Sequence, residues 1–388
     1  MNFKSIVNVT LAVGLSFSLA GCSSSSSSDA FKLGGSGPLS GNAAEYGTAV
    51  RNAAEIAVDE INKKDGKVKF ELDFEDDQST GDSASAAFNN LLDWGMQVSL
   101  LTTTSGPAQV VAPLYKDQNI FAITPSGSTP AVTFADPNNA SDPYGNVFQM
   151  CFSDPNIGTA AADYISAHQL GSRIGIIYRN DDNYSTGVYN KFIEEAKEKK
   201  LNIVATETFT DGAADYSVQV KKCADEGADL VFMPIYYQPA SQILIEADKE
   251  GYKPVFFGCD GMDGILTLDN FDTKYAEGLY MLTPFSADAR DEKTQNFVKA
   301  YKEKTGDVPN QFAADAYDAV YAIDQALENS DVTPSSSTDD ITSALISQFT
   351  SMTFNGITGT DVTWNKNGEV SKTPKAVIIK DGAYVSAD

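Results

Sequence analysis

Residues 98–123 read VSLLTTTSGPAQVVAPLYKDQNIFAI. The stretch opens with a buried-type strand at 98–101 and closes with another at 120–123, and a helical pattern over 110–117 separates them. Parallel strands need a crossover of this kind, whereas antiparallel strands can be joined by a tight turn. The stretch therefore predicts a βαβ unit within an α/β fold.

The same alternation extends in both directions along the chain. On the N-terminal side we expect a strand at 31–35, a helix at 45–63, a strand near 68–74 and a helix at 83–94. A loop-rich stretch at 136–146 marks a boundary, and the alternation then restarts. The later strands are expected at 173–178, 203–209, 230–234, 255–258 and 279–283, with helices near 157–169, 185–199, 215–226 and 239–250.

The C-terminal part adds helical patterns at 291–304 and 311–327 and strand-like patterns at 354–364 and 376–385. Taken together, the patterns predict two doubly wound, Rossmann-like lobes, since about 360 residues exceed what one hydrophobic core usually holds. Ligands bind at the carboxyl ends of parallel strands, so the cleft between the lobes is the expected site.

The N-terminus reads as an export signal with a lipid attachment point. Lys4 precedes an apolar core that is too short to span a membrane, and Leu19-Ala20-Gly21-Cys22 resembles the lipobox of bacterial lipoproteins. We expect a signal peptide at 1–22, a lipid on Cys22 and a Ser-rich tether at 23–29. The predicted location is the extracytoplasmic face of a bacterial cell membrane; the alternative is an ordinary secretory signal.

The chain is strongly acidic, with 53 Asp and Glu against 28 Lys and Arg and a net charge of -25. This charge repels nucleic acid and anionic lipid headgroups, so no nucleic-acid partner is expected. Most of these carboxylates are expected on solvated helix surfaces, where they are usually inert.

The sequence offers little for catalysis or metal binding. His168 is the only histidine, so neither a His-based triad nor a multi-histidine metal site can be assembled. The paired carboxylates Asp76-Asp77 and Asp181-Asp182 follow strands, where turns favour Asp. We therefore expect no enzyme activity, no cofactor and no metal.

Three cysteines follow Cys22, namely Cys151, Cys223 and Cys259. They allow one disulfide at most, and a bridge between Cys151 and Cys259 is conceivable in an exported protein. Buried free thiols are the preferred interpretation.

Hydroxyl-rich loops follow two of the expected strands, at 102–106 and 124–129. Backbone N–H groups at a helix start, aided by hydroxyls, can bind a carboxylate without a basic side chain, although such clusters equally serve as helix caps. Asp260 follows another strand and can pair with an ammonium group. The aromatic residues Tyr46, Tyr184, Tyr236 and Phe312 are expected to form an apolar wall. Hydroxyl donors, one acid and an aromatic wall together indicate a binding site for a free amino acid.

Six short motifs occur in order along the chain: GPLSG at 37–41 with Tyr46-Gly47, the loops 102–107 and 124–130, DNYSTG at 182–187, IYY at 235–237, and GCDG at 258–261. Together they resemble the leucine/isoleucine/valine-binding protein family, the type I periplasmic binding proteins that serve ABC importers. The resemblance implies two lobes joined by three crossovers. We expect one lobe at 30–150 plus 285–370 and the other at 151–284 plus 371–388.

The resemblance also implies residue roles. Ser105 and Ser128 match the positions that hold the ligand carboxylate, with Gly127 contributing backbone, and Asp260 matches the acid that pairs with the amino group. Ser126 and Gly127 occupy positions whose main-chain carbonyls face the ligand ammonium in the family. Tyr46, Tyr184, Tyr236 and Phe312 match the residues that form the pocket walls. Thr103 and Thr104 make the first loop more polar than in leucine-type members, so the identity of the amino acid stays open.

The leading expectation is a monomeric lipoprotein that captures an amino acid, branched-chain or similar, and delivers it to ABC permease subunits. Closure is expected to use hinges near 149–154 and 283–287. A sensor of an amino acid or amide is the alternative within the binding class, and an extracytoplasmic serine hydrolase is the rival enzyme.

The lipid attachment can be tested by Cys22→Ser. We expect the variant to move from the membrane fraction to the soluble fraction with its ligand affinity intact, because the thiol that carries the lipid is gone. Labelled palmitate is the readout, and label that persists in the variant would contradict lipid attachment at Cys22.

Overall fold

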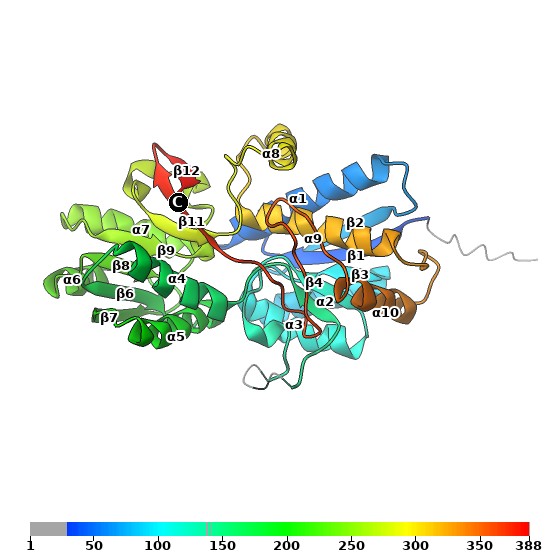
Figure 1. Ribbon diagram of the computed structural model, residues 1–388, viewed down its shortest axis with the longest axis horizontal. Helices are drawn as coiled ribbons and strands as arrows, with labels where there is room; N and C mark the ends of the chain where they lie inside the picture. The colour runs from blue at the N-terminus through cyan, green and yellow to red at the C-terminus, as the bar shows by residue number, and fades with distance from the viewer. Residues whose placement is uncertain (1–28, 137–138, 140, 388) are drawn as a thin grey trace, which may run out of the picture.

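The computed structural model describes residues 29–136, 139 and 141–387. Its strands form two separate sheets that lie side by side, each flanked by helices (Figure 1). The predicted α/β class with two doubly wound lobes is confirmed. The predicted signal peptide, Cys22 and all of the tether except Asp29 lie outside the described residues.

The first sheet is parallel throughout and has the strand order β2-β1-β3-β4-β5. Its strand β1 pairs Leu33 with Leu72 of β2 on one side and with Val98 of β3 on the other. The strands are β1 (Phe31–Gly37), β2 (Phe70–Asp76), β3 (Val98–Leu100), β4 (Phe121–Thr124) and β5 (Val147–Gln149).

Helices cover both faces of this sheet. On one face, Phe349 packs against Phe121 and Phe148, with ring centroids 4.8 and 5.6 Å away. On the other face, Phe88 and Tyr115 pack together 4.8 Å apart. The first face carries α1 (Ala44–Lys63), α9 (Gln311–Glu328) and α10 (Thr338–Phe349), and the second carries α2 (Gly81–Trp94) and α3 (Ser105–Asp117).

The second sheet has the order β12-β11-β10-β9-β8-β6-β7 and is parallel from β6 to β10. The last two strands form an antiparallel hairpin whose turn, Asp381-Gly382, has φ values of 52° and 70°, as turns joining such strands require. The strands are β6 (Ile174–Arg179), β7 (Ile203–Phe209), β8 (Leu230–Met233), β9 (Val255–Gly258), β10 (Tyr280–Thr283), β11 (Lys375–Lys380) and β12 (Ala383–Ser386).

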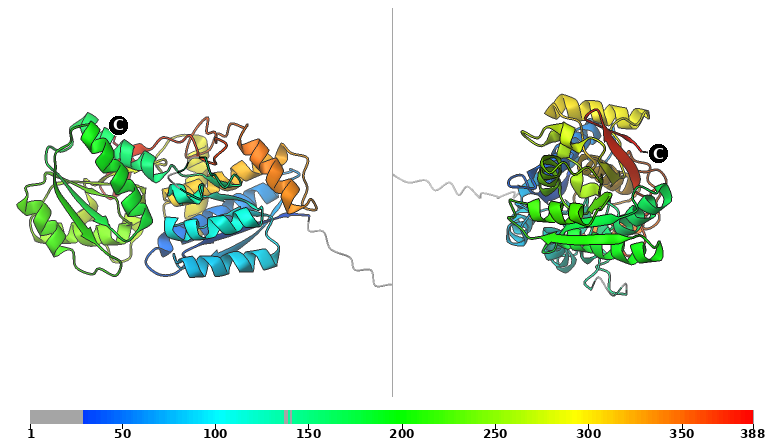
Figure 2. Two further views of the ribbon diagram at one scale, coloured as in Figure 1. Left: turned by 90° about the horizontal axis from the view of Figure 1, so that it is seen from below. Right: turned by 90° about the vertical axis from the view of Figure 1, so that its left-hand side faces the viewer.

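The second sheet is also sandwiched between helices, as the end-on view in Figure 2 shows. Its helix pairs are α4 (Asp154–His168) with α5 (Asn183–Glu198) and α6 (Ser217–Asp225) with α7 (Tyr237–Lys249). The turns after β9 form short 3-10 segments, η2 (Asp260–Met262), η3 (Ile265–Thr267) and η4 (Thr273–Ala276), and η1 (Pro130–Val132) follows β4.

The chain passes between the two halves three times: between β5 and α4, between β10 and α8 (Glu292–Thr305), and before β11. The strand predicted at 354–364 is wrong, since the segment forms only isolated bridges. Its backbone is held by a side chain instead: the N–H groups of Ile357 and Thr358 donate to the Asp318 carboxylate at 3.0 and 2.8 Å. The helix α10 has no counterpart among the sequence predictions.

The three described cysteines, Cys151, Cys223 and Cys259, are buried and unpaired. The preferred interpretation of buried free thiols is therefore confirmed, and the conceivable bridge between Cys151 and Cys259 is absent. Burial raises the pKa of the Cys151 and Cys259 thiols well above the usual value, which keeps them protonated.

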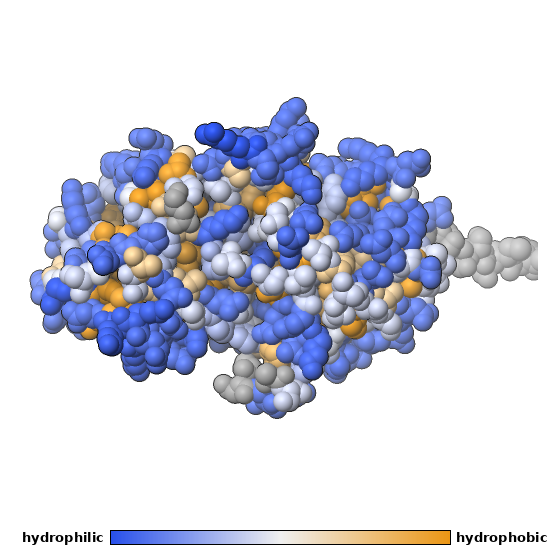
Figure 3. Space-filling model, in the orientation of Figure 1, coloured by the Kyte–Doolittle hydropathy of each residue, from blue (hydrophilic) through white to orange (hydrophobic). Residues whose placement is uncertain are grey.

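Hydrophilic residues cover most of the face shown in Figure 3, and apolar residues appear there as small patches. This agrees with the large excess of acidic residues in the sequence. Within residues 29–136, 139 and 141–387, no helix combines the length and hydropathy that a membrane span needs.

Gly368 lets the segment before β11 pack closely against β5 of the first sheet. Gly368 has a φ of 83°, its carbonyl accepts a hydrogen bond from Gln149 N–H at 2.9 Å, and a methyl group on it would lie 2.3 Å from the Val147 carbonyl oxygen. Gly145 has a similar φ of 82° with nothing within 4 Å.

We expect Gly145→Ala to lower the free energy of unfolding by about 1 kcal/mol, which is the left-handed strain alone. Gly368→Ala should lower it by roughly 3 kcal/mol, because backbone cannot move away cheaply. Urea denaturation measures the free energy of unfolding of both variants. Equal decreases in the two variants would contradict the clash of Gly368→Ala with β5.

Candidate functional site

The loops that follow strands of both sheets meet in one small pocket between them. We call it the inner pocket, and it is lined by Tyr46, Thr103, Thr104, Ser105, Ser126, Ser128, Tyr184, Tyr236, Asp260, Gly261 and Phe312. Residues 103–105 follow β3, residues 126 and 128 follow β4, Tyr236 follows β8, and Asp260 follows β9. The site therefore lies at the carboxyl ends of the parallel strands, as expected.

Hydroxyl groups form one wall of the inner pocket. Ser105 Oγ lies 3.4 Å from Ser128 Oγ and accepts a hydrogen bond from Ser128 N–H at 3.2 Å. Ser126 Oγ donates to the Thr103 carbonyl at 2.6 Å, which ties the two loops together. The wall is thus a connected neutral network whose members are all buried.

The start of α3 lies in the same wall and is not capped by a side chain. Thr104 occupies the N-cap position, but its Oγ1 pairs with Ser79 Oγ at 2.8 Å instead of with the helix N–H groups. The first-turn N–H groups of α3 are therefore available to an anion. This favours the carboxylate interpretation of the 102–106 loop over the capping one.

Asp260 faces this wall from the second sheet. Only 4% of its surface is exposed, and Tyr184 Oη donates to its Oδ1 at 2.7 Å. Burial raises the pKa of Asp260 to about 7, although the Tyr184 hydrogen bond opposes the rise. Gln311 of α9 donates to the Asp260 carbonyl at 2.8 Å, so the turn is fixed from the first half of the molecule.

Aromatic rings close the remaining sides. Tyr46 packs against Phe312 and Tyr236, with ring centroids 4.5 and 5.4 Å away, and Tyr184 stacks on Tyr236 at 5.2 Å. Tyr46 Oη donates to the Gly261 carbonyl at 2.5 Å, which links α1 to the turn after β9. A methyl group on Gly261 would lie 2.9 Å from the Tyr184 ring, so only glycine fits there.

The inner pocket is small in this structure. Its volume is about 10 Å³, which is room for about one water molecule. A larger guest therefore requires the walls to separate before it enters. Since the walls belong to different halves of the molecule, relative movement of the halves would open the pocket.

The structure brings together eight of the nine predicted binding residues. The exception is Gly127, whose N–H donates to Thr124 Oγ1 at 2.7 Å and whose carbonyl accepts from Gln149 at 2.8 Å. Thr103, Thr104 and Gly261 were not predicted as site residues, although Thr104 and Gly261 adjoin predicted residues and Thr103 lies two positions before Ser105. Their position near predicted residues at strand ends was the available signal.

This arrangement of two doubly wound halves around a cleft defines the class of two-lobed solute-binding proteins. The model of the family described as "Periplasmic binding protein" matches residues 30–383. The chain belongs to this periplasmic binding protein family. The predicted resemblance to the leucine/isoleucine/valine-binding proteins is confirmed by the relatives that follow.

The Leu/Ile/Val-binding protein of Escherichia coli (strain K12) is 28% identical over 320 residues, which cover 81% of this chain and 84% of that protein. LivJ from Streptococcus pneumoniae, a branched-chain amino acid transporter substrate binding protein solved with isoleucine, has a TM-score of 0.82 and 25% identity over 92% of this chain and 98% of its own. These relatives are binding proteins, and they favour solute binding over sensing.

A solute binding protein of an ABC transporter from R. palustris, solved with benzoate, shares the fold, with a TM-score of 0.79. It is 19% identical, and the match covers 92% of this chain and 95% of that one. One fold thus accommodates chemically different ligands, and the ligand of this chain has to be argued from its own residues.

Proposed function

We propose that this protein captures a free α-amino acid in the inner pocket and delivers it to the permease subunits of an ABC importer. One observation carries the proposal: a neutral wall of hydroxyl and N–H donors faces a buried carboxylate across the pocket. An α-amino acid presents the complementary pair, a carboxylate and an ammonium group.

The ligand carboxylate would lie against Ser105, Ser128 and the start of α3. Hydroxyl and N–H donors there, aided by the helix dipole, stabilise an anion without a cationic side chain. The Ser126 carbonyl would face the ammonium, whereas Gly127, whose N–H and carbonyl are bonded to Thr124 and Gln149, would support the loop from outside the pocket.

The ligand ammonium would pair with Asp260. A buried carboxylate without a cation is costly, and this cost is the physical cause of its raised pKa. An ammonium group would offset the cost and favour the ionised form. Tyr46, Tyr184, Tyr236 and Phe312 would exclude water from the pair.

Capture would proceed by movement of two rigid lobes. The first would comprise 30–150 with 285–370 and the second 151–284 with 371–388, turning at hinges near 149–154 and 283–287. Cross-cleft contacts such as Tyr46 Oη with Gly261 and Tyr237 Oη with the Asn42 carbonyl, at 3.0 Å, would stabilise the closed form.

A lipid on Cys22 would hold the monomeric protein at the extracytoplasmic face of the membrane, with the serine tether as spacer. Anchoring keeps the captured solute close to the permease and raises its effective concentration there. The folded body supplies recognition, and no catalytic step is required of it.

Asp260→Asn tests the ammonium pair directly. Asparagine can still accept the Tyr184 hydrogen bond, so the fold is retained while the ligand charge is left unpaired. Affinity for the best amino acid should fall by about 30-fold to a few thousand-fold, since losing one partner of a desolvated pair costs roughly 2 to 5 kcal/mol. Asp269→Asn, at an exposed position in a loop after β9, is the matched control.

Calorimetric titration supplies both affinities. If Asp260→Asn binds within about threefold of the wild type, a difference under 1 kcal/mol, the amino-acid assignment fails and a binder of an uncharged solute remains.

The raised pKa of Asp260, about 7, makes binding depend on pH. Because the ligand ammonium needs the ionised carboxylate, affinity should be full above pH 7 and fall about tenfold per unit as pH drops below it. Asp260→Asn should lose this slope. A wild-type affinity that stays constant from pH 8 to pH 5 would contradict the pairing.

A further inference from the structure

A second, larger cavity adjoins the inner pocket at Tyr236, which lines both. We call it the outer cavity; its volume is about 610 Å³. Gln78 and Thr80 line it from the first half of the molecule, and Arg179, Asp182 and Asp211 line it from the second. The two cavities thus share Tyr236 as a common wall, and the outer one is much the larger.

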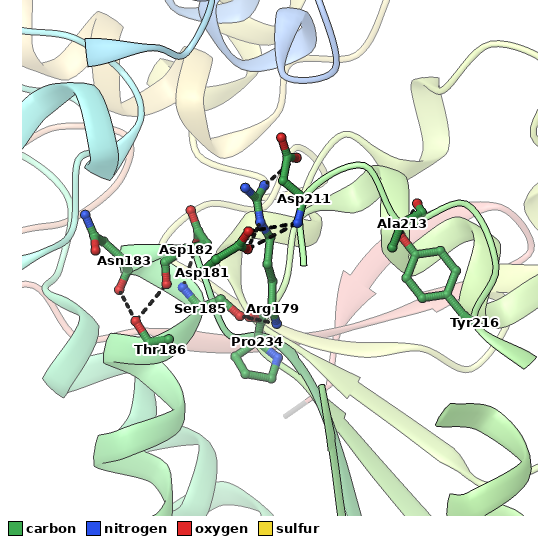
Figure 4. Close-up of polar contacts among 10 residues, drawn as sticks. All are labelled: Arg179, Asp181, Asp182, Asn183, Ser185, Thr186, Asp211, Ala213, Tyr216 and Pro234. Carbon is green, nitrogen blue, oxygen red and sulfur yellow. Dashed lines mark hydrogen bonds and ion pairs between the residues drawn. The ribbon is translucent and has the colours of Figure 1, made fainter. Parts of the chain in front are cut away.

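The outer cavity carries an excess of negative charge. Arg179 donates to Asp181 at 2.7 Å and pairs with Asp211 at 3.1 Å, while Asp211 N–H donates to the Asp181 carboxylate at 3.0 Å (Figure 4). Asp182 is the third carboxylate beside this guanidinium. Of these carboxylates, Asp182 and Asp211 line the outer cavity together with Arg179, so its lining carries a net charge of -1, and carboxylates already occupy two donors of Arg179.

Burial raises the pKa of Asp182, although the Ser185 N–H hydrogen bond and the Arg179 charge oppose the rise. Asp182 occupies the N-cap position of α5, where its Oδ1 accepts a hydrogen bond from Ser185 N–H at 2.9 Å. The positive end of the helix dipole stabilises a carboxylate there. Asp182 is therefore a partly buried carboxylate in the lining of the outer cavity, and a nearby cation would favour its ionised form.

Aromatic faces complete the lining. Phe209 and Tyr216, 5.1 Å apart at centroids, both border the outer cavity, and Tyr236 separates it from the inner pocket. Such rings attract cations over their faces. Gln238 and Gln242 add amide groups to the lining.

We propose that the outer cavity receives the cationic end of the ligand's side chain, so that the captured solute is a basic amino acid of the arginine or lysine class. This inference rests on the proposed function, because the inner pocket must hold the α-carboxylate and α-ammonium. A long unbranched side chain would pass Tyr236 and place its charge among Asp182, Asp211 and the rings. A compact branched side chain would not reach these carboxylates.

Calorimetric titration with arginine, citrulline, leucine and glutamate tests the inference. Citrulline has nearly the shape of arginine without its charge, so the arginine-to-citrulline ratio isolates the cation. We expect arginine to bind at least tenfold more tightly than citrulline, and Asp182→Asn, which can still cap α5, to reduce the ratio to within threefold. Asp225→Asn, an exposed carboxylate of α6 paired with Lys221, should leave the ratio unchanged.

Each result decides one way. Tighter binding of leucine or glutamate than of arginine would overturn the basic-ligand inference and leave the proposed function standing. A preference for arginine that persists undiminished in Asp182→Asn would overturn the placement of the cation in the outer cavity. Binding of no amino acid at all by the wild type would overturn the proposed function and this inference together.

Discussion

The site depends on one constraint: in each sheet the parallel strands end at the same edge, and these two edges face each other. Segments that are far apart in sequence therefore meet, as Tyr46 of α1 and Gly261 after β9 do through a direct hydrogen bond. The hydroxyl wall comes from one edge and Asp260 from the other. Neither edge alone can hold both ends of an amino acid, which couples binding to the approach of the two halves.

Charge is distributed unevenly within this cleft. The wall assigned to the ligand carboxylate contains no cationic side chain and relies on Ser105, Ser128 and the α3 N-terminus. The opposite side gathers carboxylates: Asp260 lies inside the pocket and Asp182 at its outer boundary. Burial makes each unpaired carboxylate costly, so this side of the cleft favours a guest that brings positive charge. The same physics explains both the proposed amino-acid site and its extension.

Much of the fold and site could be predicted from sequence because parallel strands leave continuous apolar runs and the site residues directly follow them. The segment 354–364 was mistaken for a strand since its partner, the Asp318 carboxylate, lies on a distant helix and leaves no local pattern. Helix α10 was missed although Ser337 caps it and accepts from Asp340 N–H. The outer cavity itself was not predicted, because residues as distant in sequence as Gln78 and Asp211 come to line one space only in the fold.

The central claim is that both ends of an α-amino acid are recognised, one by each half of the molecule. The most direct measurement is a calorimetric comparison of the best-binding amino acid with its 2-hydroxy acid and its decarboxylated amine, which each remove one end. We expect either analogue to bind at least 30-fold more weakly than the parent amino acid, which is a loss of about 2 kcal/mol in binding free energy. A hydroxy acid or amine that binds within threefold of the parent amino acid would contradict it.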